Sequence, residues 1–254
     1  MSEINTNSEK SKRFAVVKKN KFKSITEKFG PLLGLLLLCF VLSIIAPDFL
    51  RIQNIMNIAN QSSINCLISM GMLLTILTAG IDLSVGSILA LSTCVMGISI
   101  VNWNINPFLG ILICLTTGAF CGLMNGVLLT KLRLPHPFIS TLAMKNVARG
   151  LALIITLASP ISGFPKSIQY IGSGTIGPIP ISFILVIFVC IGFYIFLNRT
   201  AQGRHIYALG GNKEAAALSG VNVDKTLIVV YTLCGLMAAL AGVVMVGRVN
   251  SASP

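Results

Sequence analysis

Charged residues are scarce in this 254-residue chain, at 10% of the total, against about 25% in soluble globular domains. Carboxylates are the scarcest, with 7 Asp and Glu against 19 Lys and Arg, while 54% of the residues are hydrophobic. This balance excludes a water-soluble protein, and it makes the cations markers of membrane sidedness rather than of nucleic-acid binding. Four classes remain open: channel, transporter, intramembrane enzyme and assembly scaffold.

Motifs for catalysis, nucleotide binding and metal binding are also missing. The chain has no GxxxxGK[ST] phosphate loop, so we do not expect it to hydrolyse ATP. His136 and His205 lie outside the long apolar runs and Asp82 has no acidic neighbour, so no intramembrane catalytic set can be assembled. The seven cysteines lie singly in apolar runs without a CxxC pair, which is typical of buried thiols rather than of disulfides or a zinc site. The GSGTIG string at 172–177 lacks the preceding strand and following helix of a dinucleotide fingerprint. The sequence therefore predicts no catalytic residue, metal or cofactor in this chain.

Long apolar runs make up most of the remaining chain. A helix needs about 20 residues to cross roughly 30 Å of hydrocarbon, and seven runs meet this length, at approximately 29–47, 62–80, 83–102, 107–130, 137–158, 181–198 and 226–247. The sequence therefore predicts an all-α, polytopic membrane helix bundle with about seven spans.

The residues before the first run form a basic arm. Residues 1–28 hold eight cations and three carboxylates, which predicts a disordered cytoplasmic tail ahead of a membrane domain at 29–254. No small-residue cleavage site follows the first run, so we interpret it as an uncleaved span rather than a signal peptide.

The distribution of cations tests this topology. With a cytoplasmic N-terminus, 14 of the 19 cations fall in the arm and the inner loops, three fall in outer loops, and Lys145 and Arg149 fall within a span. This strong bias agrees with the positive-inside rule.

The longest inner loop, 199–225, has residues typical of the two ends of a short helix outside the membrane. Asn212 is suited to an N-cap, Glu214 to the first turn, and Gly220 to the C-terminal stop. Because a two-turn helix is marginal alone in water, we interpret it as a docking element. The alternative is a surface turn between spans.

The segment Thr78 to Ser87 carries Asp82, the only carboxylate between Asp48 and Glu214. Asp82 either caps the third span near the membrane surface or marks a helix break that faces an internal cavity, as in transporters.

Polar side chains within other spans suggest a path for a solute. Gln61, Asn65 and Ser69 are spaced by four residues and share one face of the second span, where they could bind a solute or bond neighbouring helices. Lys145 and Arg149 are also four apart, and cations at membrane depth are costly without water or a partner. Either they line an aqueous path, or the segment begins as a helix at the inner surface and the fifth span is drawn too early.

Three glycines on the fourth span permit close helix packing. Gly118, Gly122 and Gly126 form a double GxxxG pattern, which indicates close contact with another helix of this chain or, alternatively, with another subunit.

Several strings together resemble the permease subunits of bacterial ATP-binding-cassette importers for simple sugars, most closely those for ribose. The matching strings are QSSIN (61–65), ILTAGIDLSVGSILAL (76–91), PFISTL (137–142), ARGLAL (148–153), GRHIYALGGN (203–212), EAAALSGVNV (214–223) and GRVNSASP (247–254). The resemblance covers nearly everything after about residue 29.

The resemblance implies an inner-membrane importer. Glu214, Ala215, Ala216 and Gly220 match the EAA---G signature, which implies docking on a cytoplasmic ATPase subunit that holds the ATP and Mg²⁺. It also implies two permease copies and an external sugar-binding protein, with Asp82, Arg149 and the polar row of the second span as candidates for the translocation path. The substrate could be ribose, another pentose, a hexose or an autoinducer-2-like sugar.

The chain also departs from the family pattern. Ala217 stands where members commonly have Arg, and the lysine-rich arm has no family role. Members continue beyond the SASP segment with further spans, so we expect this chain to be the N-terminal bulk of a permease. The alternative function is that of a shortened, non-transporting permease that serves assembly or regulation.

Overall fold

The computed structural model describes residues 29–254, and the basic arm predicted at 1–28 lies outside this range. The chain divides into two units, Met1–Ile55 and Met56–Pro254. The described part of the first unit is an apolar helix, Phe29–Ile45, then a turn and the start of α2 (Ile52–Leu77). Asn54 donates a hydrogen bond from Nδ2 to the carbonyl of Phe49 at 2.9 Å, which ties the first turn of α2 to the residues before it.

The second unit continues α2 and is almost entirely helical. Its further elements are α3 (Val85–Gly97), the π-helix η1 (Ile98–Asn102), α4 (Pro107–Lys131), α5 (Pro137–Thr156), α6 (Lys166–Ser173), α7 (Ile181–Arg199), α8 (Ala201–Gly211), α9 (Lys213–Leu218) and α10 (Val223–Val249).

Local sequence explains where these helices begin. Pro107 and Pro137 occupy the first positions of α4 and α5, where a missing N–H costs no hydrogen bond. The side-chain oxygen of Asn222 accepts a hydrogen bond from the Lys225 amide at 2.9 Å, which caps the start of α10.

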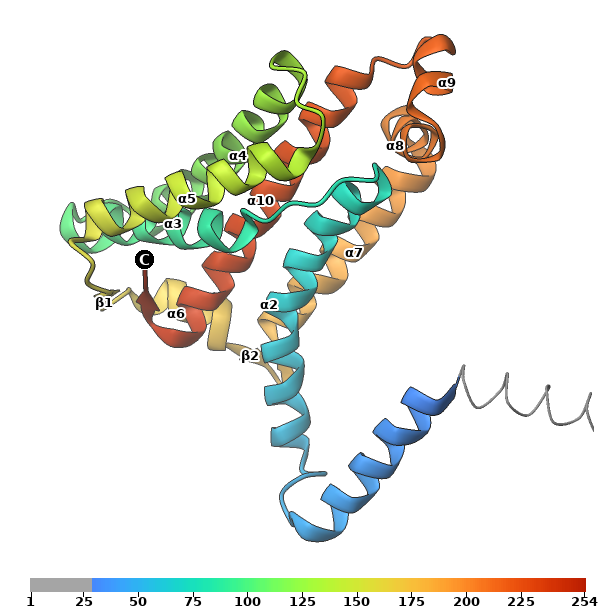
Figure 1. Ribbon diagram of the computed structural model, residues 1–254. Helices are drawn as coiled ribbons and strands as arrows, with labels where there is room; N and C mark the ends of the chain where they lie inside the picture. Colours follow the sequence, from blue (N-terminus) through green and yellow to red (C-terminus); the bar gives the residue numbers. More distant parts are fainter. Residues whose placement is uncertain (1–28) are drawn as a thin grey trace, which may run out of the picture. The chain divides into compact units, whose positions relative to one another are not determined.

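The core of the second unit forms around α10. This helix packs most extensively against α4, α3 and α6, and Figure 1 shows it passing between the α3, α4 and α5 group and the α2 and α7 pair. Tyr231, Val243 and Val244 of α10 are fully or almost fully buried. Most of α10 is therefore shielded by the neighbouring helices of this chain.

Two short antiparallel strand pairs connect the loops. β1 (Ile161–Ser162) pairs with β4 (Ser251–Ala252), which joins the α5–α6 connection to the segment after α10. β2 (Thr175–Ile176) pairs with β3 (Ile179–Pro180). The GSGTIG string thus forms the end of α6, β2 and the turn after it, and no strand precedes it in the manner of a dinucleotide site.

The predicted fold class, a polytopic helical membrane protein, is confirmed. Within residues 29–254, five helices are long and apolar enough to cross a membrane: Val85–Asn102, Pro107–Lys131, Pro137–Thr156, Ile181–Arg199 and Val223–Val249. They coincide with five of the seven predicted spans. The predicted spans 29–47 and 62–80 are also helical, but Phe29–Ile45 is shorter, and α2 carries many amide and hydroxyl side chains.

Candidate functional site

The loop predicted at 199–225 contains two consecutive helices, α8 and α9. The sequence predicted only the second, because Gly203, Gly210 and Gly211 lower the intrinsic helix propensity of the first. Tertiary packing overrides this preference: Ile206 and Leu209 of α8 are buried in a cluster with residues of α2, α4, α7 and α10. α8 is thus anchored on the ends of four other helices.

The short helix α9 begins and ends where its capping residues, Asn212 and Gly220, predicted. The side-chain oxygen of Asn212 accepts a hydrogen bond from the Ala215 amide at 2.9 Å, and Gly220 takes the left-handed backbone with φ +84°. Ala216 is buried, whereas Glu214 and Ala215 are exposed. α9 therefore rests on this chain by one side and presents the other, which is an arrangement suited to docking.

Between α2 and α3 the chain leaves the helical conformation for seven residues, 78–84, here called the helix break. Ala79 adopts a left-handed backbone with φ +57°, and the Gly80 amide donates back to the carbonyl of Thr75 at 2.8 Å. This 6→1 bond is typical of a helix terminus closed by a left-handed residue. A Cβ on Gly80 would lie 2.6 Å from the hydroxyl of Tyr231, so the break lies directly against α10.

Asp82 is buried in this break, with only 1% of its surface exposed. Its Oδ1 accepts hydrogen bonds from the Ser84 amide at 2.8 Å and from the Ser84 hydroxyl at 2.5 Å. Asn125 of α4 donates from Nδ2 to the same hydroxyl at 2.8 Å. The side chains of Asp82, Ser84 and Asn125, here called the break network, therefore fix the break to α4.

The break network leaves two oxygens without hydrogen-bond partners among the described residues, Oδ2 of Asp82 and Oδ1 of Asn125. Asp82 also lacks a cationic partner, because the ion pair found within residues 29–254 joins Arg51 to Asp48. A buried carboxyl without a cation is electrostatically costly. The break is therefore unusual in this bundle because it buries a carboxyl whose charge no cation of the described part of the chain balances.

The two hypotheses for Asp82 can be compared with this geometry. Ser84 is the N-cap of α3 and makes no side-chain capping bond, and the Asp82 carboxyl bonds Ser84 rather than the first-turn amides of α3. The chain does leave the helical conformation at Asp82, while the internal cavity that Asp82 would face and its role in translocation stay predictions. Sequence reasoning missed Asn125, although an amide between Gly122 and Gly126 of an apolar helix was an available signal.

The polar row predicted on the second span lies along one exposed side of α2. Gln61, Asn65 and Ser69 are all exposed, whereas Ser63 and Leu67 on another side of α2 are buried. Within the second unit, therefore, no other helix of this chain covers the row.

Lys145 and Arg149 also share an exposed side, that of α5. The helix runs without interruption from Pro137 to Thr156, so both cations lie in its middle turns, while Met144 and Ala148, each directly before one of the cations, are buried. Lipid on this side would leave two cations without water. The arrangement favours water or a protein partner over lipid there.

Comparison with known proteins identifies the type of molecule. Residues 54–254 match the family model described as the branched-chain amino acid transport system / permease component. This match covers the break, both exposed polar sides and the α8–α9 segment. The chain belongs to this permease family.

The individual relatives within the family are sugar permeases by name. The chain is 41% identical to the ribose import permease of Bacillus subtilis strain 168, over 93% of this chain and 74% of that one. It is 42% identical to the ribose import permease of Escherichia coli K12, over 88% and 70%. The fructose import permease of Rhizobium meliloti is 40% identical over 78% of this chain and 57% of its own length. No solved structure matches the chain.

The double GxxxG of this permease lies inside its own bundle. A Cβ on Gly118 would lie 2.5 Å from Ala239 of α10, a Cβ on Gly122 would overlap the Tyr231 carbonyl oxygen, and a Cβ on Gly126 would lie 2.7 Å from the Cα of Ile228. All three glycines therefore face α10 and permit close approach of two backbones.

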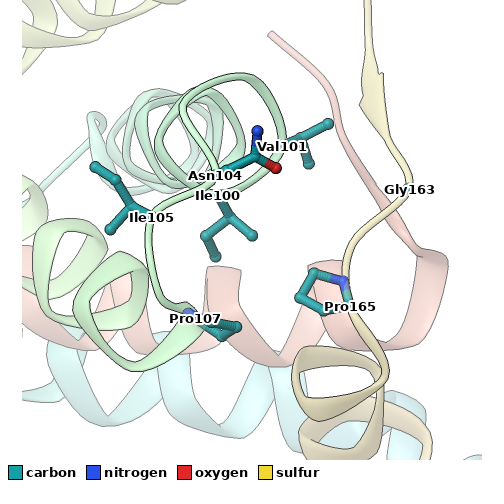
Figure 2. A pocket seen from close by; sticks show the side chains of 7 residues that line it. All are labelled: Ile100, Val101, Asn104, Ile105, Pro107, Gly163 and Pro165. Carbon is teal, nitrogen blue, oxygen red and sulfur yellow. The ribbon is translucent and has the colours of Figure 1, made fainter.

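A cavity lies near the opposite end of α10 from α9. It has a volume of about 310 Å³ and is bordered by η1, the residues after it and the β1–α6 connection, as Figure 2 shows. Asn104 and Gly163 contribute to its wall, and both have a positive φ. The other lining residues are apolar: Ile100, Val101, Ile105, Pro107 and Pro165.

Proposed function

We propose that this chain is the membrane-spanning permease of an ATP-driven sugar importer and that ribose is the sugar it carries. The observation that carries this proposal is the 41% and 42% identity to two ribose import permeases over 93% and 88% of the chain. The fructose relative at 40% identity places other simple sugars within the same class.

The proposed importer needs partners that this chain does not provide. The sequence has no phosphate loop, so a separate cytoplasmic ATPase would bind ATP and Mg²⁺ and hydrolyse the nucleotide. α9 is the proposed docking element, because its capped backbone is fixed on the bundle while Glu214 and Ala215 stay exposed. A second permease copy and an external sugar-binding protein would complete the importer in the inner membrane.

The two uncovered polar sides are the proposed walls of the sugar path. Gln61, Asn65 and Ser69 of α2 offer amide and hydroxyl groups, which suit the hydroxyl groups of a neutral sugar. Lys145 and Arg149 of α5 would keep their side of the path hydrated. No tight site is needed here, since the external binding protein would deliver the sugar.

The test is uptake of labelled ribose by cells that lack only their ribose permease. Expression of this chain, together with its ATPase and binding protein, should restore uptake, and a hydrolysis-deficient ATPase should abolish it. Labelled fructose, allose and galactose, each supplied to the same cells in place of ribose, report the selectivity. Absence of uptake of all four sugars, with the chain present in the membrane and both partners present in the cells, would contradict the proposal.

A further inference from the structure

The last turn of α8 lies directly against the backbone at the end of α2. A Cβ on Gly210 would overlap the carbonyl oxygen of Leu77 and lie 3.0 Å from its carbonyl carbon. Because carbon atoms do not approach so closely, only glycine fits at this position. The two backbones touch without an intervening side chain, so a displacement of α8 acts on Leu77 at once.

On one side of this contact, a single residue connects α8 to α9. Asn212 ends α8, where its amide donates to the Ala208 carbonyl, and its side chain caps α9. A movement of α9 therefore reaches Gly210 through a very short connection, with little slack to absorb it.

On the other side, the contact lies at the end of α2. Leu77 is the last residue of α2 and the break follows immediately, with Ala79 in the left-handed conformation and Gly80 against Tyr231. Force on the Leu77 carbonyl would thus act on the segment that carries Asp82, rather than on the middle of a stiff helix.

A cavity beside the contact leaves room for such a movement. It has a volume of about 270 Å³, and its walls include Thr78 and Ala79 of the break, the 134–137 connection and residues 209–213. Close-packed interiors resist small displacements. This cavity borders both the break and the end of α8, so either segment can shift into it without displacing packed side chains.

We propose that Gly210 is a positioning residue whose backbone contact with Leu77 carries movement of α9 to the helix break. The inference rests on the proposed function in one respect: it takes α9 as the element that the ATPase moves.

The neighbouring glycine provides a matched control. Gly211 belongs to the same turn of α8, but a Cβ there would meet nothing within 4 Å. Ala is a better helix former than Gly at either position, so Gly210→Ala and Gly211→Ala differ chiefly in the clash with Leu77.

The experiment measures how the break responds to ATP in the complex of this chain and its ATPase. Ala79 is exposed and lines the cavity, so an Ala79→Cys variant reports the break through its rate of reaction with a thiol reagent, above the background of the native cysteines. We expect ATP to change this rate at least threefold in the Ala79→Cys chain and in the chain that also carries Gly211→Ala. The change should be lost with Gly210→Ala, and ribose uptake should fall about tenfold in that variant only.

A second variant keeps the test sharp if Gly210→Ala lowers stability. One glycine inserted between Gly211 and Asn212 leaves the Gly210–Leu77 contact intact but adds slack before α9, and it should also abolish the response to ATP while the ATPase stays bound. An unchanged response in both the Gly210→Ala and the insertion variants would overturn the inference, as would equal losses in Gly210→Ala and Gly211→Ala. The labelling rate depends on ATP and not on sugar, so it still decides the inference if the native chain imports none of the sugars tested.

Discussion

At the scale of single residues, Asp82 is the side chain whose environment departs furthest from expectation. A carboxyl that is 1% exposed and has no cationic partner among the described residues contributes through its hydrogen bonds with Ser84. Both of these bonds are accepted by Oδ1. The ability of Asp82 to accept hydrogen bonds, rather than its negative charge, therefore holds the break network together.

We therefore expect the free energy of unfolding of Asp82→Asn to lie within about 1 kcal/mol of that of the native chain, since an amide oxygen can accept the same two bonds. Asp82→Leu leaves the Ser84 amide and hydroxyl without an acceptor, at a cost of about 1–3 kcal/mol for each buried group. Thermal unfolding in detergent measures both. Asp48→Asn serves as control, because the Asp48 side chain is 72% exposed and such ion pairs contribute little. Equal losses in Asp82→Asn and Asp82→Leu would show that the charge itself is required.

A serine of α2 and a threonine of α4 offer a test of the sugar path at the same scale. Ser69 lies on the polar row, whereas Thr116 is exposed on α4 and its hydroxyl donates to the Leu112 carbonyl of its own helix at 2.9 Å. A hydrogen bond to a neutral group contributes about 0.5–1.5 kcal/mol, so Ser69→Ala should weaken ribose uptake by about two- to tenfold. Thr116→Val should leave uptake unchanged. A similar effect of both substitutions, or of neither, would remove Ser69 from the path.

At the scale of secondary-structure elements, the contact between α4 and α10 organises the bundle. Three glycines of α4 bring its backbone onto α10, and the same turns of α4 carry Asn125 to Ser84. Close approach of the two helices thus also positions the break network.

Gly122→Ala should destabilise the bundle, because the added methyl would overlap the Tyr231 carbonyl oxygen and lie 3.0 Å from the Cα of Thr232. Overpacking of this kind costs about 1–3 kcal/mol. Gly150→Ala in α5 meets nothing within 4 Å and should be neutral or stabilising by up to about 1 kcal/mol. Unfolding temperatures in detergent should separate the two variants. A Gly122→Ala chain as stable as Gly150→Ala would mean that α4 and α10 are further apart than described.

At the scale of the whole molecule, the arrangement across the membrane can be tested with two reporter fusions. α7 separates the β2–β3 region from α8 and carries no charged side chain before Arg199, its last residue. A reporter fused after Gly174 should be external and one fused after Arg204 cytoplasmic, as the excess of cations in the 199–225 loop predicts. Alkaline phosphatase and green fluorescent protein fusions read the two sides. The same side for both sites would contradict the topology.

Much of the architecture was predictable from the sequence, because membrane helices are specified by length and polarity within the segment itself. The capped α9 followed from Asn212 and Gly220 for the same local reason. α8 did not, because its glycines argue against a helix, and it is stabilised by the burial of Ile206 and Leu209 and by the Thr200 hydroxyl, which accepts from the Gly203 amide at 3.1 Å. The bond between Asn125 and Ser84 joins residues 41 positions apart, and no local pattern encodes such a pairing.

The central position of α10 has a consequence for biosynthesis. α3, α4 and α6 all precede α10 in the chain, yet each packs extensively against it. During translation these helices leave the ribosome first. Until α10 is synthesised, the glycine surface of α4 is therefore in contact with lipid or with the insertion machinery. Correct assembly therefore depends on a late-made helix entering between helices that are already in place, and a nascent chain arrested before residue 223 would lack the central helix of its bundle.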